Sequence, residues 1–529
     1  MIKELIAKEV VGLDSQPVAL CYDMDALKET LLALKAAYPP HFLHAIAIKS
    51  NPLPFFLKFA VEQGFGLECA SIAEVVLALR QGCSPDRIMF DSPAKSKREI
   101  SFALRHNVQV NADNFFELDR IVEARAKLQA DGVFSTSHVG VRVNPLVGLG
   151  AIKALSVSDA RSKFGIPLNV ENRKNMVELF RQYPWLDSVH IHVGSQGCSM
   201  EQHASGAAKL ADFVGEIESA VGAGRVRVID IGGGLPVNFD SEEVKPRYCD
   251  YSQILRHSAP ALFTNPDRTI VTEYGRSVNA KAAWAVCAVE YVKESGDGLS
   301  IAVIQAGADL FMRTCYCPAN FPLRVSGHNQ TDGKRLVTAA QEANGANGHC
   351  VHGHADGGQG RMRGHVRPEA RVTVAGPLCF GGDKIAEEVD LPQLQEGDFI
   401  VVHDAGANTL STFSRYASRP FFDIFGVGHS FIIQRADGLS KHTTPVRGLT
   451  NKCVPQCRPS RPGSLPPVLV RYAHGRWTRS HCSRTAPPVY GYYCTQADDG
   501  KWSRINVVLL KPAESLEDVL SFWEGARVS

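Results

Sequence analysis

Long hydrophobic runs are missing from this sequence of 529 residues. No window approaches 18 uninterrupted apolar residues, the length that a membrane-spanning helix needs. The first segment, MIKELIAKEVVGLDSQPVALCYD, also lacks the apolar stretch and small-residue cleavage site of a secretory signal. We therefore expect a cytoplasmic protein without a membrane partner.

An excess of charge of one sign is also missing. The chain has 57 basic and 55 acidic residues, and its formal net charge is +2. So balanced a charge creates no field that would attract the phosphates of a nucleic acid. We expect no nucleic-acid partner.

The 14 cysteines do not follow the spacing of a disulfide framework. Several of them, such as Cys21, Cys69 and Cys287, lie in apolar segments that are typical of a core. A chain this long does not depend on disulfides for its stability, so the sequence favours free thiols in a reducing compartment.

Apolar strands alternate with helix-like stretches from residue 17 to residue 280. Examples are VALCYD before DALKETLLALKAAY and HAIAIK before PFFLKFAVEQ. Near-continuous apolar strands indicate a parallel sheet that is covered on both faces. The number of repeats favours a closed (β/α)8 barrel, of the TIM type, over an open doubly wound sheet.

The pattern changes after residue 280, where strand-like runs follow one another without long amphipathic helices. We predict a β-sandwich or β-barrel domain formed by residues 281–420 and 486–529 with residues 1–16. Residues 326–368 are rich in Gly, His, Asn and Gln and are predicted to be a flexible insertion. Residues 421–485 have little periodicity and are predicted to be a disordered insertion.

Both insertions contain histidine and cysteine, but no metal site is predicted. The first holds His349, Cys350, His352 and His354, and the second holds Cys453, Cys457, His481 and Cys482. Neither spacing matches a structural zinc pattern.

The segment LHAIAIKSNPLP, residues 43–54, is an apolar strand that ends on Lys49. The lysine could simply be solvated where the strand reaches the surface, as most lysines are. It could instead lie at the mouth of the barrel, where desolvation turns its amine into a Schiff-base nucleophile. The remaining strand ends decide between these interpretations.

Three further strand ends carry polar groups of a consistent kind. HIHVGSQ places His192 before a Gly-Ser turn, VIDIGGGLP places Gly232, Gly233 and Gly234 after a strand, and IVTEYGR gives Glu273, Gly275 and Arg276. Glycines that expose backbone N–H groups, with an arginine nearby, suit a phosphate. With a lysine, an imidazole and an acid, the set fits pyridoxal phosphate.

The sequence resembles the fold-type III pyridoxal-phosphate decarboxylases that act on diaminopimelate, ornithine and arginine. The resemblance covers residues 17 to 420 and resumes at APPVYGYY. It rests on motifs in family order: AIKSNP, GLECASIAEV, ARSKFGIP, HVGSQ, DIGGGLP, EYGRS, GPLCFGGD and DAGANTLS.

The resemblance implies a role for each matching residue. Lys49 would bind the cofactor covalently, His192 would stack on its ring, and Glu273 would pair with its ring nitrogen. The phosphate and the adjoining substrate carboxylate would be held by Ser195, Gly232 to Gly234, Gly275, Arg276 and Asn408. Cys379 would return a proton to the substrate carbon in the partner subunit's site, which implies a homodimer with shared active sites.

Departures from the family pattern bear on the substrate. Phe380 follows Cys379 where relatives that bind a distal ammonium usually carry an acid, which counts against ornithine and, to a lesser degree, against diaminopimelate. GADLFMRTCY resembles the segment with a substrate-binding Arg and Tyr, here Arg313 and Tyr316, and Asp383 completes the predicted substrate contacts. Arginine suits a distal carboxylate, and Asn408 stands where the family usually has a tyrosine.

We therefore expect decarboxylation of diaminopimelate to L-lysine or of a related carboxylate-bearing amino acid. Three alternatives stay open: a siderophore-precursor decarboxylase, an ornithine or arginine decarboxylase, and a non-catalytic regulatory homologue.

Overall fold

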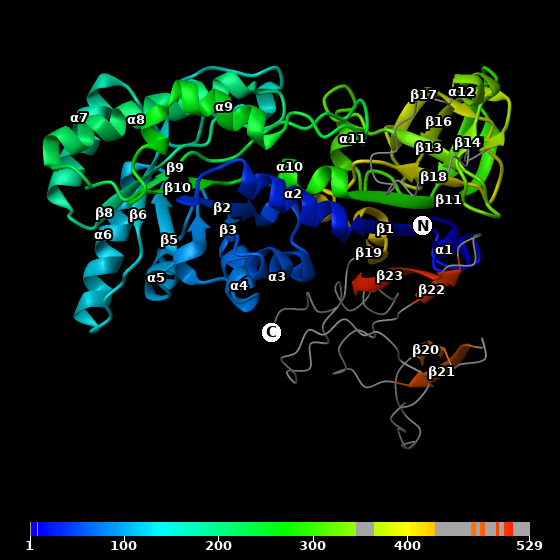
Figure 1. Ribbon diagram of the computed structural model, residues 1–529, viewed down its shortest axis with the longest axis horizontal. Helices are drawn as coiled ribbons and strands as arrows, with labels where there is room; N and C mark the ends of the chain where they lie inside the picture. The colour runs from blue at the N-terminus through cyan, green and yellow to red at the C-terminus, as the bar shows by residue number, and fades with distance from the viewer. Residues whose placement is uncertain are drawn as a thin grey trace.

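The computed structural model describes residues 2–7, 9–344 and 364–428, together with the backbone of four further strands within 467–511. These residues form two large sheets. Figure 1 shows the barrel with its helices in one lobe and the second sheet in the other.

The first sheet is a closed parallel barrel of eight strands. Each strand pairs in parallel with the next, and the ring closes where β10 pairs with β2. In ring order the strands are β2 (Phe42–Ala47), β3 (Gly66–Cys69), β4 (Ile88–Phe90), β5 (Gln109–Ala112), β6 (Val139–Asn144), β8 (Leu186–His190), β9 (Val228–Asp230) and β10 (Thr269–Thr272). The short strand β7 (Ile166–Pro167) pairs with β6 outside the ring. The predicted (β/α)8 barrel is confirmed.

Helices follow the barrel strands in sequence and surround them (Figure 1). They are α3 (Pro54–Glu62), α4 (Ile72–Arg80), α5 (Lys97–Arg105), α6 (Phe115–Ala130), α7 (Val170–Gln182), α8 (Met200–Val221), α9 (Tyr248–Ser258) and the short α10 (Arg276–Asn279), with α2 (Met24–Ala36) before β2. Their starts follow from local chemistry, since Ser71, Asn114 and Ser199 each accept a backbone N–H of the first helical turn.

The interior of the barrel changes from apolar to polar along the strands. Leu43, Ala45, Met89, Val228 and Val271 form a small buried cluster of their own. Side chains two positions further along a strand point to the same side. Asp91, Asp230 and Glu273 therefore share this inner face and gather at the C-terminal ends of the strands, where the active sites of such barrels lie.

The second sheet is mixed and contains ten strands. Its main path runs β17-β16-β12-β11-β1-β19-β23-β22, and β18 pairs with both β11 and β13. The strands are β1 (Val18–Asp23), β11 (Ala283–Glu294), β12 (Ser300–Ile304), β13 (Val325–His328), β16 (Glu369–Ala375), β17 (Lys384–Pro392), β18 (Phe399–Val402), β19 (Asp423–Gly428), β22 (Tyr493–Gln496) and β23 (Trp502–Lys511). The predicted β domain is thus present as a mixed sheet.

Three shorter helices and two small strand pairs complete the described elements. The helices are α1 (Ile2–Ala7), α11 (Met312–Tyr316) and α12 (Ala339–Asn344), and the pairs are β14 (Leu336–Val337) with β15 (His365–Val366) and β20 (Pro467–Arg471) with β21 (Trp477–His481). Leu5 of α1 packs against the second sheet with Val286 and Phe399.

Strand β1 belongs to the second sheet, although its sequence VALCYD predicts the first strand of the barrel. It pairs antiparallel with β11 and parallel with β19. The barrel therefore begins with β2. The expected barrel range of 17–280 is corrected here, because residues 18–23 form a strand of the second sheet. A fully buried strand looks alike in either sheet, because both environments demand continuous apolar residues.

The expected insertions are also narrower in the structure. Residues 326–328 belong to β13 and pair with β18, and residues 423–428 belong to β19 and pair with β1 and β23. Most other residues of the two predicted insertions lie outside the described residues. These include all candidate metal ligands of the first insertion.

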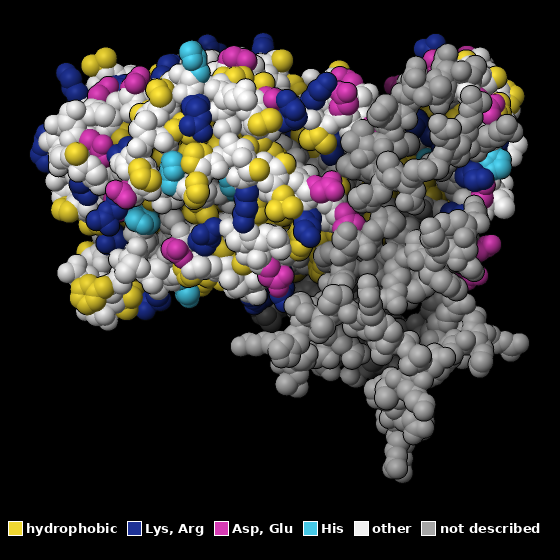
Figure 2. All heavy atoms as spheres, viewed as in Figure 1, with side chains coloured by type: hydrophobic (Ala, Val, Ile, Leu, Met, Phe, Trp, Pro, Cys, Tyr) yellow, Lys and Arg dark blue, Asp and Glu magenta, His cyan; other side chains and the backbone are white. Residues whose placement is uncertain are grey.

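Within the described residues, no helix has the length and apolar character required to cross a membrane. Figure 2 shows basic and acidic side chains interspersed over the barrel lobe, as the small net charge predicts.

Candidate active site

Lys49 lies just past β2, in the helical turn Ile48–Ser50 at the C-terminal mouth of the barrel. Its Nζ donates to both oxygens of Glu68, at 2.6 and 2.5 Å. Glu68 is on the neighbouring strand β3 and is almost fully buried, while 47% of the Lys49 side-chain surface stays accessible. The lysine therefore points into the barrel mouth and is not simply solvated.

The two groups of this ion pair influence each other strongly. Burial lowers the pKa of Lys49, but the carboxylates of Glu68 and Glu273 outweigh it, and the net pKa is raised. Burial raises the pKa of Glu68 to about 7, although Lys49 opposes this shift. These carboxylates thus favour the ammonium form of Lys49.

His192 and Glu273 meet across the barrel. The Nδ1 atom of His192 lies 3.5 Å from Oε2 of Glu273, and it also accepts the backbone N–H of Gly233 at 3.3 Å. Burial lowers the pKa of His192 to about 4, so its ring is neutral at pH 7. The structure brings these two predicted site residues together.

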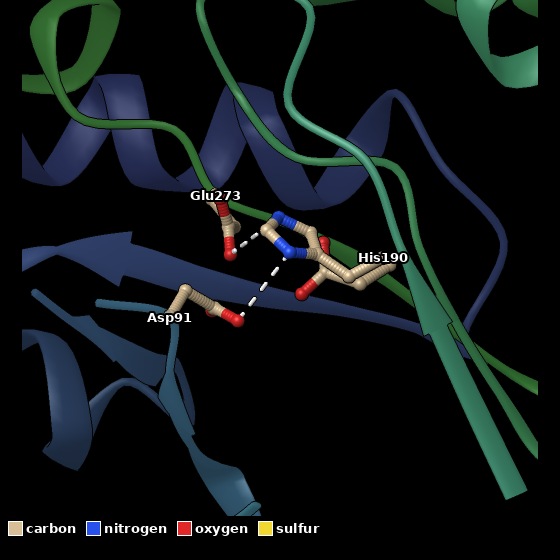
Figure 3. Close-up of side chains that lie close together, drawn as sticks. Asp91, His190 and Glu273 are labelled. Atoms are coloured by element: carbon tan, nitrogen blue, oxygen red, sulfur yellow. Dashed lines mark ion pairs between the residues drawn. The ribbon is translucent and has the colours of Figure 1, made fainter. Parts of the chain in front are cut away.

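Behind Glu273 lies a buried cluster that the sequence analysis does not identify. His190 stands between Asp91 and Glu273, as Figure 3 shows, and Asp230 lies beside them. The sequence spacing could have indicated His190, because it precedes His192 by two residues and so points to the same side of the strand. Glu68 was missed as well.

The three consecutive glycines allow backbones to pass unusually close to one another. A Cβ atom on Gly233 would lie 1.9 Å from the carbonyl oxygen of Glu273, and one on Gly234 would lie 1.9 Å from that of Gly194. Gly232 and Gly234 also have φ values of +69° and +98°, which side chains rarely adopt. Larger residues would push apart the loops that carry His192 and Glu273.

Arg276 and Arg313 line the same pocket, together with Phe239, Phe321 and Asn408. Both guanidinium groups lie over the Phe321 ring, at 6.0 and 5.5 Å from its centroid. Burial and the charge of Arg313 lower the pKa of Arg276 to about 10. Neither arginine forms an ion pair with a residue that the structure describes, so the pocket has positive charge to offer an anion.

A loop of the second domain contacts the backbone of Lys49. The amide of Asn408 donates to the Lys49 carbonyl at 3.2 Å, and the hydroxyl of Ser411 donates to the same oxygen at 2.6 Å. The N–H of Asn408 donates to the Ser50 carbonyl at 2.8 Å. Asn408 therefore lies beside Lys49, and its described contacts are to the backbone of this chain, whereas the resemblance implies a contact with the cofactor phosphate.

Cys379 lies on an exposed loop after β16 and does not line the arginine pocket of its own chain. The neighbouring Phe380 stacks on Tyr316 at 4.7 Å. Tyr316 is 61% exposed. Cys379 and Tyr316 are therefore exposed at this edge of the second domain, whereas Phe380 between them is partly buried against the core.

The remaining predicted residues shape turns. Asp383 is buried, and its carboxylate accepts the backbone N–H groups of Ala308 and Leu378. These contacts favour a role in shaping those turns over the predicted substrate contact. Ser195 donates its N–H to Leu155, and Gly275 passes so close to Ser50 that a Cβ would lie 2.9 Å from the serine Cβ.

The residues at this site fit pyridoxal phosphate. Oε1 of Glu273 and Nε of Arg276 are buried and have no hydrogen-bond partner among the described residues. A bound molecule could therefore donate a hydrogen bond to this carboxylate oxygen and accept one from this guanidinium. Lys49 supplies a primary amine, and the glycine turn supplies close backbone approach.

Comparisons with known proteins agree with this fit. Residues 24–280 match the family model described as "Pyridoxal-dependent decarboxylase, pyridoxal binding domain". The diaminopimelate decarboxylase of Helicobacter pylori is 28% identical over 407 residues, which cover 75% of this chain and 87% of that protein. The diaminopimelate decarboxylase of Aquifex aeolicus is 24% identical over 401 residues, which cover 75% and 84%.

Solved structures give the same result for the fold. The crystal structure of diaminopimelate decarboxylase from Helicobacter pylori complexed with L-lysine has a TM-score of 0.63 and 25% identity, and the match covers 80% of this chain and 94% of that one. The lysine/ornithine decarboxylase from Vibrio vulnificus complexed with putrescine has a TM-score of 0.58, with 20% identity over 78% and 93% of the two chains, and shows the fold alone. The barrel, residues 24–280, is thus the part of the chain that matches the pyridoxal-binding domain of the pyridoxal-dependent decarboxylases.

Proposed function

We propose that the protein decarboxylates meso-diaminopimelate to L-lysine with pyridoxal 5'-phosphate as its cofactor. The choice of substrate rests on one observation. Arg276 and Arg313 are two neighbouring cations that form no ion pair with an acidic residue among the described residues. A guanidinium binds a carboxylate through two parallel hydrogen bonds. Diaminopimelate retains a second carboxylate at the end that does not react.

The cofactor would be held by residues from several barrel strands. Lys49 would attach it covalently, Glu273 would face its ring nitrogen, and His192 would lie against its ring. Its phosphate would be bound at the glycine turn, with Ser195, Gly275 and Arg276 nearby. When bound, pyridoxal phosphate supplies an electron sink for the pair of electrons that remains on the substrate carbon as carbon dioxide leaves.

A proton must then reach the same carbon. Lys49 is one source within the chain, because Glu68 and Glu273 together raise its pKa and favour the ammonium form. We assign the productive transfer to the thiol of Cys379 of the partner subunit, since a thiol can act as a general acid. In this assignment the active site is shared between two subunits.

A homodimer is therefore part of the proposal. Tyr316 supports it, because its ring is 61% exposed in the single chain, where it stacks on Phe380 next to Cys379. Exposed aromatic residues are enriched at protein interfaces. We further propose a cytoplasmic location, which the nine free cysteines of the described residues support.

One alternative substrate class is disfavoured by a specific side chain. Phe380 follows Cys379 and stacks on Tyr316, so this position offers a distal ammonium no carboxylate. The distal ammonium of diaminopimelate has the distal carboxylate on the same carbon, whereas the ammonium of ornithine or the guanidinium of arginine would need to be neutralised elsewhere.

The test combines a spectrum with a substrate screen. Purified protein loaded with pyridoxal phosphate should show a visible absorbance band that borohydride removes and that Lys49→Ala lacks. It should release carbon dioxide from meso-diaminopimelate and form L-lysine in equal amount. Turnover of ornithine, arginine or a siderophore precursor instead would overturn the substrate, and absence of the band would leave a non-catalytic homologue.

A further inference from the structure

His190 is a buried imidazole with a carboxylate at each nitrogen. Its Nδ1 lies 3.4 Å from Oδ1 of Asp91, and its Nε2 lies 3.6 Å from Oε1 of Glu273. Only 1% of the His190 side chain and 2% of the Glu273 side chain are accessible. Figure 3 shows the imidazole between the two acids.

This geometry constrains the protons in the cluster. A neutral imidazole has one N–H donor and one acceptor, whereas here both nitrogens face carboxylate oxygens. Both contacts are favourable only if the ring carries two protons or if Asp91 is itself protonated. In either case the cluster holds a proton close to Glu273.

The surroundings raise the pKa of two of the acids and lower the pKa of the third. Burial raises the pKa of Asp91 to about 6 and raises that of Asp230 well above its usual range. Burial acts on Glu273 in the same direction, but His190, His192 and the hydrogen bond with Asp91 hold its pKa well below the usual range. Glu273 is therefore the carboxylate that stays ionised.

Other groups fix the cluster from neighbouring strands. Asn111 of β5 donates to Oδ1 of Asp91 at 2.6 Å, and the N–H of Gly232 donates to Oδ1 of Asp230 at 2.8 Å. Beyond them lie Lys49 with Glu68, and Arg142 of β6, whose charges act on Glu273 or His192.

We propose that His190, anchored by Asp91, is a positioning residue that keeps Glu273 ionised and aimed at the ring nitrogen of the cofactor. The inference rests on the proposed function only in that it requires bound pyridoxal phosphate. A buried carboxylate would otherwise tend to take up a proton and lose its charge. His190 opposes this, because in either arrangement of the protons its Nε2–H faces Oε1 of Glu273.

The experiment follows the ring nitrogen directly. Wild type and His190→Gln are loaded with pyridoxal phosphate labelled with 15N in its ring, and the 15N chemical shift is recorded across pH 6 to 9. The wild-type nitrogen should stay protonated throughout this range. In His190→Gln it should lose its proton within the range, and kcat should fall at least about tenfold with little change in KM.

Controls separate positioning from general damage. His44→Gln removes another buried imidazole, on β2, which contacts Thr272 and forms no ion pair with a carboxylate in the described part of the chain. It should leave the ring nitrogen protonated. If His190→Gln does not fold, Asp91→Asn provides a second variant and should shift the nitrogen in the same direction by a smaller amount.

Two outcomes would overturn the inference alone: a ring nitrogen in loaded His190→Gln that behaves as in wild type, or stoichiometric binding of Zn²⁺ by the cofactor-free wild type that His190→Gln abolishes. The second would make the cluster a metal site, which its four donors within 4.8 Å of one another could form. A loaded wild type that decarboxylates nothing would instead refute the proposed function and leave the nitrogen result standing.

Discussion

The hydroxyl of Ser411 donates to the main-chain carbonyl of Lys49 at 2.6 Å, so the second domain contacts the turn that carries the Lys49 amine. Asn408 donates to the same oxygen at 3.2 Å. The barrel alone therefore does not define the position of Lys49.

Ser411→Ala and Asn408→Ala should each lower the free energy of unfolding by about 1 kcal/mol, the usual contribution of one hydrogen bond. Each should also speed the loss of pyridoxal phosphate on dialysis, because the turn at Lys49 becomes more mobile. Urea unfolding and cofactor absorbance measure the two effects. The control is Ser219→Ala, which removes a hydroxyl that bonds only to its own helix α8. Equal behaviour of all three variants would refute the coupling.

Glu68→Gln should make cofactor-free protein react with pyridoxal phosphate several-fold faster at pH 7. The attacking species is the neutral amine, and Glu68 stabilises the ammonium form of Lys49. Stopped-flow absorbance would record the rate. Glu74→Gln is the matched control, since Glu74 accepts the N–H of Ala70 and acts on Lys49 only weakly. A slower reaction in Glu68→Gln would contradict the assignment.

Arg313→Ala should lower kcat/KM for meso-diaminopimelate by about 10- to 100-fold, because a charge-assisted pair with the distal carboxylate is lost. Arg313→Lys should fall between this variant and wild type, since lysine keeps the charge without the planar fork. Steady-state kinetics test this. Arg371→Ala removes an exposed arginine paired with Glu388 and should leave the constants unchanged. An unaltered kcat/KM in Arg313→Ala would remove the basis for the substrate.

Two inactive variants should complement each other if the active site is shared. Lys49→Ala and Cys379→Ala subunits, mixed so that dimers form at random, should recover about a quarter of wild-type activity, because a mixed dimer keeps one intact site of two. Activity assays on separated homodimers and mixed dimers would test this. Mixed dimers without activity would show that each chain works by itself.

His44 should make the protein sensitive to acid. Burial and the charge of Lys35 lower the pKa of His44 from 6.5 to about 3, so the folded protein binds fewer protons than the unfolded chain between these values. Stability is therefore present above pH 6.5 and is lost as the pH falls toward 3. His44→Gln should lose about 2 kcal/mol less than wild type between pH 7 and pH 4.5.

Urea unfolding at the two pH values measures this difference. His257→Gln, on the exposed side of α9, is the control. If wild type and His44→Gln lost the same stability on acidification, His44 would have to be charged in the folded protein.

The barrel could be predicted because its signal is local: apolar strands and amphipathic helices alternate within short windows. Lys49, His192 and Glu273 could be predicted because each ends a strand, and parallel strands end at one edge. Glu68, Asp91 and Asp230 have the same position, but their importance depends on which strand lies beside which. The order of the strands follows from the pairing of β10 with β2, which are far apart in the sequence, so a local sequence pattern does not reveal it.

Asn408 and Asp383 illustrate a second limit. Motif position places both near the site, yet their polar atoms bind backbone groups of this chain. Whether a polar side chain faces a ligand or a turn depends on the fold around it.

Strand β1 has a consequence for synthesis on the ribosome. Residues 18–23 emerge early, but their partners in β11 and β19 begin only at residues 283 and 423. At about 5–20 residues per second, β1 must wait tens of seconds for both neighbours. During this time the barrel can close while an apolar strand stays unpaired and open to aggregation. A fragment that ends at residue 280 would keep that exposed strand permanently, so the barrel is best produced as part of the full chain.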